Sequence, residues 1–252
     1  MTSTSDADPD TDLSHDAFLG GRVMAWQPKR GFRAGIDTLL LAAAVPAKAD
    51  QTVLELGCGV GVASMALAAR VPAQVTGVER QPDYAALAAR NGVEVVNADL
   101  ATLPHDLRQR SFDHVMINPP YYDRTRRLAA TDTGREDALA EDTPLDVWMQ
   151  VAAQRLKPKG TLTVIYKTPR LDHLLAALPP SLGSRRILPL QPRTGRDSHL
   201  VLLRARKDGK DPLRLHAPQK IHAAARHEAD KPDYTPEIEA VLLDAAALSF
   251  PD

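Results

Sequence analysis

The chain has 252 residues and a formal net charge of −1, with 44% hydrophobic and 25% charged residues. This composition is that of an ordinary globular protein, and the length suffices for one α/β domain with a sizeable core. The single cysteine, Cys58, excludes an intrachain disulfide and makes a reducing cytoplasm the simplest location. The N-terminus lacks the basic and apolar regions of a signal peptide, and no apolar run is long enough to cross a membrane.

The N-terminal residues 1–16 hold five aspartates, several serines and threonines, and no lysine or arginine. They have few apolar side chains to bury, so we expect a disordered acidic tail. Residues 17–252 are predicted to form a single domain. Within it we expect a hairpin and helix in 17–50, a central core in 51–206 and a C-terminal extension in 207–252.

In chain order, the sequence predicts a short hairpin over 18–27, a helix capped by Asp37 and ending near Ala44, and then an alternation of strands and helices. This alternation is typical of a doubly wound, mostly parallel α/β sheet, and the last two strands look like an antiparallel pair. The seven expected strands are 52–56, 74–78, 93–97, 112–117, 161–166, 186–190 and 199–205. The later helices are expected at 62–70, 82–90, 144–156, 171–178 and 236–248, with a further short strand at 213–215.

The apolar strand at 112–117 ends abruptly in Asn118-Pro119-Pro120-Tyr121. Proline lacks an N–H and has a fixed φ, so the strand stops here, at the edge where open α/β sheets bind ligands. The Asn118 amide oxygen and the Pro119 carbonyl can both accept hydrogen bonds from one –NH2 group, and Tyr121 offers a flat face to a planar base or amide. We therefore predict that Asn118, Pro119, Pro120 and Tyr121 are catalytic, with a merely rigid turn as the alternative.

A glycine-rich turn, residues 57–61 (Gly-Cys-Gly-Val-Gly), follows the strand at 52–56, and with Glu55 and Leu56 it forms the motif of residues 55–61. A dinucleotide-binding turn would have its third glycine at residue 62, where this chain has valine. Glu79 ends the second strand, and Asp99 follows the third. With Asn118-Pro119-Pro120-Tyr121 as the fourth, these motifs occur in order and each at a strand end, and the missing third glycine counts against a dinucleotide. The run at 55–61 looks like motif I of the class I methyltransferases, a resemblance that makes S-adenosylmethionine the expected cofactor.

These motifs resemble motifs I and IV of the class I S-adenosylmethionine-dependent amino-methyltransferases. Three further stretches, 33–42, 191–207 and 233–237, resemble the bacterial tRNA1(Val) adenine-37 N6-methyltransferase family. The resemblance spans about residues 18–248 and implies a Rossmann-like fold with seven strands. It also implies N6-methylation of an adenine in RNA, namely position 37 of a tRNA such as tRNA1(Val).

The same resemblance implies roles for individual residues. Glu55 would bind the turn or act through water on the cofactor's ammonium group, Glu79 would hold the ribose hydroxyls, and Asp99 would accept a hydrogen bond from the adenine amino group. The full set of expected cofactor-binding residues is Glu55, Gly57, Cys58, Gly59, Gly61, Glu79, Arg80, Asp99 and Asn118, together with Arg33, Gly35 and Asp37.

Positive charge is concentrated in residues 185–220, where ten Lys/Arg and three Asp give a local charge of +7. More arginines follow the Asn-Pro-Pro-Tyr turn. Runs of charged residues often form only solvent-exposed surface. These basic residues follow the predicted site, so contact with RNA phosphates is as good an interpretation as a solvated surface. The candidate RNA-binding residues are Arg124, Arg126, Arg127, Arg193 and Arg196.

Two other functions are open. A protein glutamine-N5 methyltransferase uses the same motif on a planar amide, but such enzymes resemble two-domain chains with a larger N-terminal domain than the roughly fifty residues available here. A non-catalytic RNA-binding protein on this fold is the third interpretation. The basic insert at 217–231 is longer than the family suggests, which leaves the RNA target open. The eight histidines show no ligand spacing, so we predict no metal.

Overall fold

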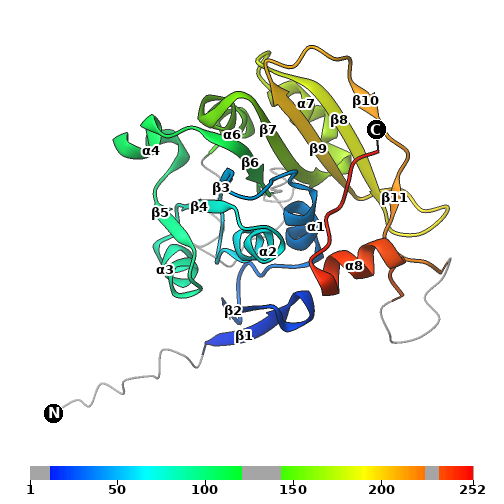
Figure 1. Cartoon of the computed structure of the whole chain (residues 1–252), viewed down its shortest axis with the longest axis horizontal. Helices are drawn as coiled ribbons and strands as arrows, with labels where there is room; N and C mark the ends of the chain where they lie inside the picture. The colour runs from blue at the N-terminus through cyan, green and yellow to red at the C-terminus, as the bar shows by residue number, and fades with distance from the viewer. Residues whose placement is uncertain (1–11, 121–142, 225–232, 252) are drawn as a thin grey trace, which may run out of the picture.

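A mixed sheet of nine strands forms the centre of the molecule in the computed structural model, which describes residues 12–120, 143–224 and 233–251 (Figure 1). The strand order is β10-β8-β9-β7-β6-β3-β4-β5, and β11 also pairs with β8. All pairs are parallel except those of β9, which runs antiparallel to both neighbours. The strands are β3 (Thr52–Leu56), β4 (Gln74–Glu79), β5 (Glu94–Asn97), β6 (Phe112–Ile117), β7 (Leu156–Lys167), β8 (Leu182–Gln191), β9 (Leu200–Lys207), β10 (Arg214–Leu215) and β11 (Gln219–Lys220).

This arrangement confirms the predicted Rossmann-like α/β fold. The seven expected strands, β3 to β9, form the mostly parallel sheet with its antiparallel C-terminal pair, and the two-residue strands β10 and β11 extend it at one edge. Strand β7 is longer than expected because it begins at Leu156, the residue at which the sequence predicts the end of a helix. None of the helices in the described ranges is long and apolar enough to cross a lipid bilayer.

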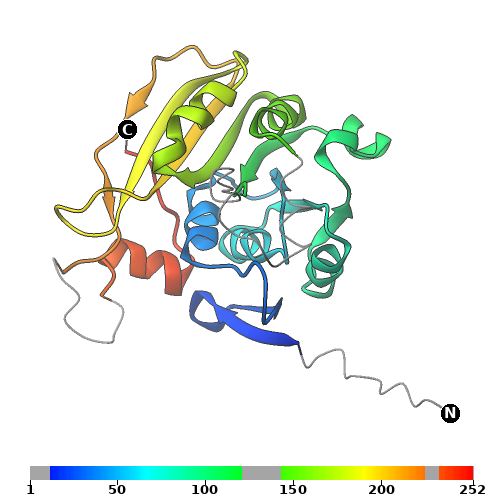
Figure 2. The ribbon, with the colours of Figure 1, turned by 180° about the vertical axis from the view of Figure 1, so that it is seen from behind.

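Helices cover both faces of the sheet (Figures 1 and 2). On one face, α1, α2 and α8 pack around Met116 of β6, while α6 and α7 cover the other face, where Val115 and Ile117 of the same strand point. Successive residues of a strand point to opposite faces, so a run that is apolar throughout fits a strand buried on both sides. The helices are α1 (Ile36–Ala44), α2 (Val62–Arg70), α3 (Pro82–Arg90), α4 (His105–Gln109), α6 (Leu145–Arg155), α7 (Leu171–Ala177) and α8 (Pro236–Asp244).

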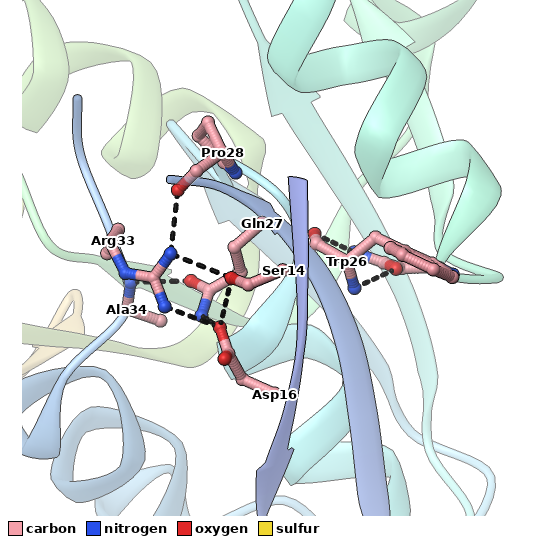
Figure 3. Close-up of polar contacts among 8 residues, drawn as sticks. Ser14, Asp16, Trp26, Gln27, Pro28, Arg33 and Ala34 are labelled. Atoms are coloured by element: carbon pink, nitrogen blue, oxygen red, sulfur yellow. Dashed lines mark hydrogen bonds and ion pairs between the residues drawn. The ribbon is translucent and has the colours of Figure 1, made fainter. Parts of the chain in front are cut away.

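The N-terminal segment differs from the prediction. Strand β1 (Leu13–Phe18) pairs antiparallel with β2 (Val23–Pro28), so the expected tail is wrong for residues 13–16. The Asp16 carboxylate accepts hydrogen bonds from Ser14, Gln27 and Arg33, which tie this strand to its neighbours (Figure 3). Burial acts to raise the pKa of Asp16, but these bonds outweigh it and lower the pKa.

Two helix ends also differ. Gly35, and not Asp37, is the N-cap of α1, and Asp37 lies in the first turn, where its negative charge is favourable to the helix dipole. Helix α8 ends at Asp244 instead of Leu248 because Ala245 adopts a left-handed conformation with φ of 56°. The start of α1, two residues earlier than predicted, decides which side chains of its first turn face the sheet edge.

Candidate active site

A pocket opens at the carboxyl ends of β3, β4 and β6, the edge at which the sequence predicts ligand binding. Glu55 and the glycine turn line it from β3, Glu79 from β4, and Asn118 and Pro120 from the end of β6. The structure therefore brings together the predicted cofactor turn and the predicted catalytic turn. Pro119 is buried beside them. Tyr121, Arg124, Arg126 and Arg127 lie outside the described residues.

The turn after β3 depends on its glycines. Gly57, Gly59 and Gly61 all have positive φ, of 68°, 55° and 85°, a region that side chains disfavour. A Cβ on Gly61 would also come within 2.5 Å of the Val93 side chain. The backbone of α2 begins directly after Gly61, so the turn leads into the helix with its N–H groups near the pocket.

Glu79 is buried at the end of β4 and holds this turn. One carboxylate oxygen accepts the N–H of Gly59 at 2.9 Å, and the other accepts the N–H of Gln81 at 2.8 Å. Each carboxylate oxygen has a second lone pair, so Glu79 has acceptor capacity left for hydroxyl groups of a ligand. Its place in the pocket wall is compatible with the predicted contact to ribose hydroxyls.

Glu55 lies deeper and is fully buried. Burial raises the pKa of its carboxyl to about 8, the hydrogen bond from Ser64 Oγ at 2.5 Å opposes this rise, and the negative charge of Glu79 adds to it. In the protein alone, burial therefore favours the protonated form of this carboxyl. A cation in the pocket would favour the ionised form, because an opposite charge stabilises a buried carboxylate.

Asp99 stands at the edge of the pocket, and its two neighbours, Ala98 and Leu100, line the wall. One carboxylate oxygen accepts the N–H of Ala101 at 2.8 Å and so caps a short helical turn. The other lies 3.8 Å from the guanidinium of Arg80, which does line the pocket. A contact between Asp99 and an adenine amino group stays a prediction.

The three N-terminal residues expected to bind cofactor do not line the pocket. Arg33 turns to the hairpin, where it forms an ion pair with Asp16 at 2.6 Å and donates to the Pro28 carbonyl (Figure 3). Gly35 caps α1, and the Asp37 carboxylate accepts a hydrogen bond from Asn118 Nδ2 at 3.2 Å. Ala34 and Thr38 of the same segment, and Phe32 just before it, line the pocket instead.

Several residues that line the pocket are not predicted by the sequence, among them Phe32, Thr38, Tyr84 and Trp148. Phe32 is 54% exposed at the pocket, and its backbone is held by Tyr84, whose hydroxyl accepts the N–H of Phe32 at 2.9 Å. Thr38 Oγ1 is buried and has no hydrogen-bond partner within the described part of the chain. Trp148 of α6 supplies an apolar wall. The sequence carries no signal for these contacts, because helix packing and not local pattern brings them to the pocket.

Arg193, an expected RNA contact, is engaged within the protein. Its guanidinium binds both carboxylate oxygens of Asp233, at 2.5 and 2.8 Å, and donates to the Ala224 carbonyl at 2.6 Å. His222 Nδ1 lies 2.8 Å from the same carboxylate. Arg196 lies three residues further along the same loop and is exposed. The two arginines therefore have different environments despite their proximity in sequence.

Within residues 12–120, 143–224 and 233–251, no group of three or more His, Cys, Asp or Glu side chains is placed to hold a metal ion. Cys58 is buried next to the turn, and burial raises the pKa of its thiol, as do the carboxylates of Glu55 and Glu79. A thiol with a raised pKa is a poor nucleophile, so Cys58 serves as a small packing residue in the pocket wall.

Comparison with known proteins gives three findings. A family model described as "Methyltransferase domain" matches residues 53–132. Proteins named tRNA1(Val) (adenine(37)-N6)-methyltransferase are similar: that of Bacteroides fragilis is 28% identical over 61% of this chain and 68% of its own length, and that of Cronobacter sakazakii 30% over 62% and 67%. Among solved structures, a predicted O-methyltransferase from Agrobacterium tumefaciens matches with a TM-score of 0.69 and 26% identity, over 86% of this chain and 100% of its own.

Proposed function

The chain belongs to the family of S-adenosylmethionine-dependent methyltransferases that includes the tRNA1(Val) (adenine(37)-N6)-methyltransferases, and from this premise we propose that it methylates the N6 amino group of an adenine in tRNA. The proposed position is adenine 37, next to the anticodon, as in the names of these relatives. The observation that carries the proposal is that Asn118 and Pro120 line the same pocket as Glu55, Glu79 and the glycine turn.

The pocket fits S-adenosylmethionine. The glycine turn presents backbone without Cβ atoms, Glu79 offers acceptor capacity to hydroxyl groups, and Thr38 presents a buried hydroxyl without a partner among the described residues. Glu55 is a buried acid that a cationic ligand would ionise. When bound, S-adenosylmethionine supplies a methyl group on a sulfonium, an electrophile that is reactive without further activation.

The acceptor pair of the turn favours an amino group as the substrate. The Asn118 amide oxygen and the Pro119 carbonyl offer two acceptors, which match the two N–H bonds of an amino group, whereas a hydroxyl has only one hydrogen to donate. Held in this way, the adenine nitrogen would direct its lone pair at the methyl carbon. The N–C bond would form as the methyl–sulfur bond breaks, its electron pair would return to sulfur to give S-adenosylhomocysteine, and the nitrogen would then release a proton to water. Most of the rate gain comes from this placement.

The target base must leave its stack to reach the pocket, as bases modified by enzymes do. We propose that Tyr121, which directly follows Pro120 in the chain, stacks on it. Arg124, Arg126 and Arg127 come within seven residues of Pro120, a reach of at most about 25 Å of extended chain. With the exposed Arg196, they are proposed to contact tRNA phosphates near the target.

The decisive experiment is methyl transfer by the purified protein to unmodified tRNA, followed by mass spectrometry of the nucleosides. N6-methyladenosine is expected in a tRNA1(Val) transcript and not in a matched transcript with guanine at position 37. Equal methylation of both transcripts would show that the modified adenine is at a position other than 37. No methylation of any tRNA, together with transfer to a protein glutamine, would replace this proposal with the glutamine alternative.

A further inference from the structure

We infer that Asp37 is a positioning residue for methyl transfer: its carboxylate holds the Asn118 amide in one orientation, so that the amide oxygen faces the target amino group. The inference rests on the proposed function and deepens it. The sequence predicts that Asp37 binds the cofactor, but this residue does not line the pocket. It contacts Asn118, which does, through the hydrogen bond from Asn118 Nδ2 to Asp37 Oδ2 at 3.2 Å.

A neutral amide is ambiguous without such a partner. The oxygen and –NH2 ends of asparagine have nearly the same shape, and a half-turn of the side chain exchanges a hydrogen-bond acceptor for a donor. The reaction needs the acceptor, because the target nitrogen also carries N–H groups. An ionised carboxylate can only accept, so it pairs with the –NH2 end of Asn118 and leaves the oxygen on the other edge of the planar amide.

The two residues are held by rigid elements. Asp37 is in the first turn of α1, which packs on the sheet, with its leucines in the same apolar cluster as Met116 of β6. Asn118 is the first residue after β6, and two prolines follow it. The pair is 81 residues apart in sequence, so its geometry depends on the docking of α1 against β6. Side chains built on helices and strands are placed more accurately than those on loops.

The charge of Asp37 also suits the reaction. As the target nitrogen forms its new bond, it becomes positive, and a carboxylate hydrogen-bonded behind the Asn118 amide polarises the amide oxygen toward that charge. If Asp37 only stabilised α1 by its favourable interaction with the helix dipole, its removal would not change the rate of methyl transfer in this way. Asp83 is its matched control, because it is an exposed carboxylate in the first turn of α3 that does not line the pocket.

The test is an exchange of the two groups. Asn118→Asp alone places two carboxylates in contact, and we expect its single-turnover rate on tRNA to fall at least 100-fold. In Asp37→Asn/Asn118→Asp, the new asparagine donates to the new carboxylate, whose other oxygen accepts from the target amine. This double variant should be at least tenfold faster than Asn118→Asp. Asp37→Asn alone should be slower than wild type by about three- to tenfold, because the new amide at residue 37 can pair with the Asn118 amide in either orientation.

Affinity for S-adenosylhomocysteine should change less than twofold in Asp37→Asn, and Asp83→Asn should match wild type in rate. A double variant no faster than Asn118→Asp would overturn the inference. So would an Asp37→Asn variant that loses cofactor affinity instead of rate. If wild type modifies no tRNA, the proposed function fails. The pairing of residues 37 and 118 is then tested by the melting temperatures of wild type, the two single variants and the double variant, each bound to S-adenosylhomocysteine. A change in melting temperature of the double variant that equals the sum of the two single changes would contradict a direct contact between these residues.

Discussion

The backbone of Gly57 lies directly against the indole ring of Trp148, so close that a Cβ on residue 57 would come within 2.6 Å of Cη2. The ring is held in place by its own N–H, which donates to the Thr143 carbonyl at 3.2 Å. The glycine turn after β3 and the wall formed by α6 are therefore one packed unit. A change at Gly57 should disturb the turn, the wall and the cofactor together.

We expect Gly57→Ala to lower both stability and cofactor affinity. The new methyl group would have to displace the Trp148 ring, and overpacking of this kind costs about 1–3 kcal/mol in addition to the strain of a positive φ. Gly92→Ala is the matched control, because Gly92 also has a positive φ, of 86°, but nothing lies within 4 Å of the place its new methyl group would take. Urea unfolding and calorimetry with S-adenosylhomocysteine would measure both variants. Equal losses of stability and cofactor affinity in the two variants would show that the strain of a positive φ, and not the contact with Trp148, is responsible.

Glu79→Ala should weaken cofactor binding by roughly 1–3 kcal/mol, since it removes charged hydrogen bonds and leaves the Gly59 and Gln81 N–H groups without their acceptor. Glu79→Gln keeps one acceptor oxygen and should lose less. Calorimetry with S-adenosylhomocysteine is the measurement, and a titration with NAD is the control that should show no tight binding. Unchanged affinity in Glu79→Ala would remove this residue from the binding site.

The stability of the cofactor-free protein should fall as the pH rises between about 4.5 and 8, because of Glu55. Its folded pKa of about 8 lies above the unfolded value of 4.5, so in this range the folded state holds the proton that the unfolded state has released. The stabilisation is complete below the unfolded pKa and is lost as the pH passes the folded one, a change of roughly 3–5 kcal/mol. Urea unfolding at several pH values should show a flatter profile for Glu55→Gln and an unchanged one for the exposed control Glu239→Gln.

Arg193 and Arg196 should respond differently to removal. Arg193→Ala breaks the ion pair with Asp233, so we expect a lower melting temperature and an unchanged salt dependence of tRNA binding. Arg196→Ala should leave the melting temperature alone and reduce the slope of log K against log salt by about 0.7, if the arginine neutralises one single-strand phosphate. Fluorescence anisotropy over a range of salt concentrations would measure this. The reverse pattern would restore Arg193 as the RNA contact.

Asn118→Ala should lower kcat by about two orders of magnitude if some 3 kcal/mol of transition-state stabilisation is lost, with little effect on cofactor affinity. Tyr121→Ala should lose roughly 1–3 kcal/mol, mainly in KM for tRNA, because stacking is present in the ground and transition states alike. Tyr121→Phe keeps the ring and should be mild. Single-turnover and steady-state methyl transfer would separate these effects, and a wild-type rate in Asn118→Ala would remove the turn from the mechanism.

The sequence by itself determined the fold class and the place of the site. Short apolar runs, their breakers and the glycine spacing are local properties, so the strands β3 to β9 and the turn at residues 57–61 could be predicted. Asn118 and the two prolines after it could be placed at the edge of the sheet for the same reason, because two prolines end a strand whatever surrounds it.

Only the tertiary structure decided which partners the polar side chains have and which of them line the pocket. Asp16 belongs to a strand because Arg33 and Gln27 reach it, Arg193 is tied to Asp233, and Asp37 meets Asn118 across 81 residues. A charged or amide side chain accepts many partners, and the one it obtains depends on how distant elements dock. Local pattern carries no record of that docking, so the sequence located the segments around the pocket while the packing of α1 and α6 on the sheet chose the residues that line it.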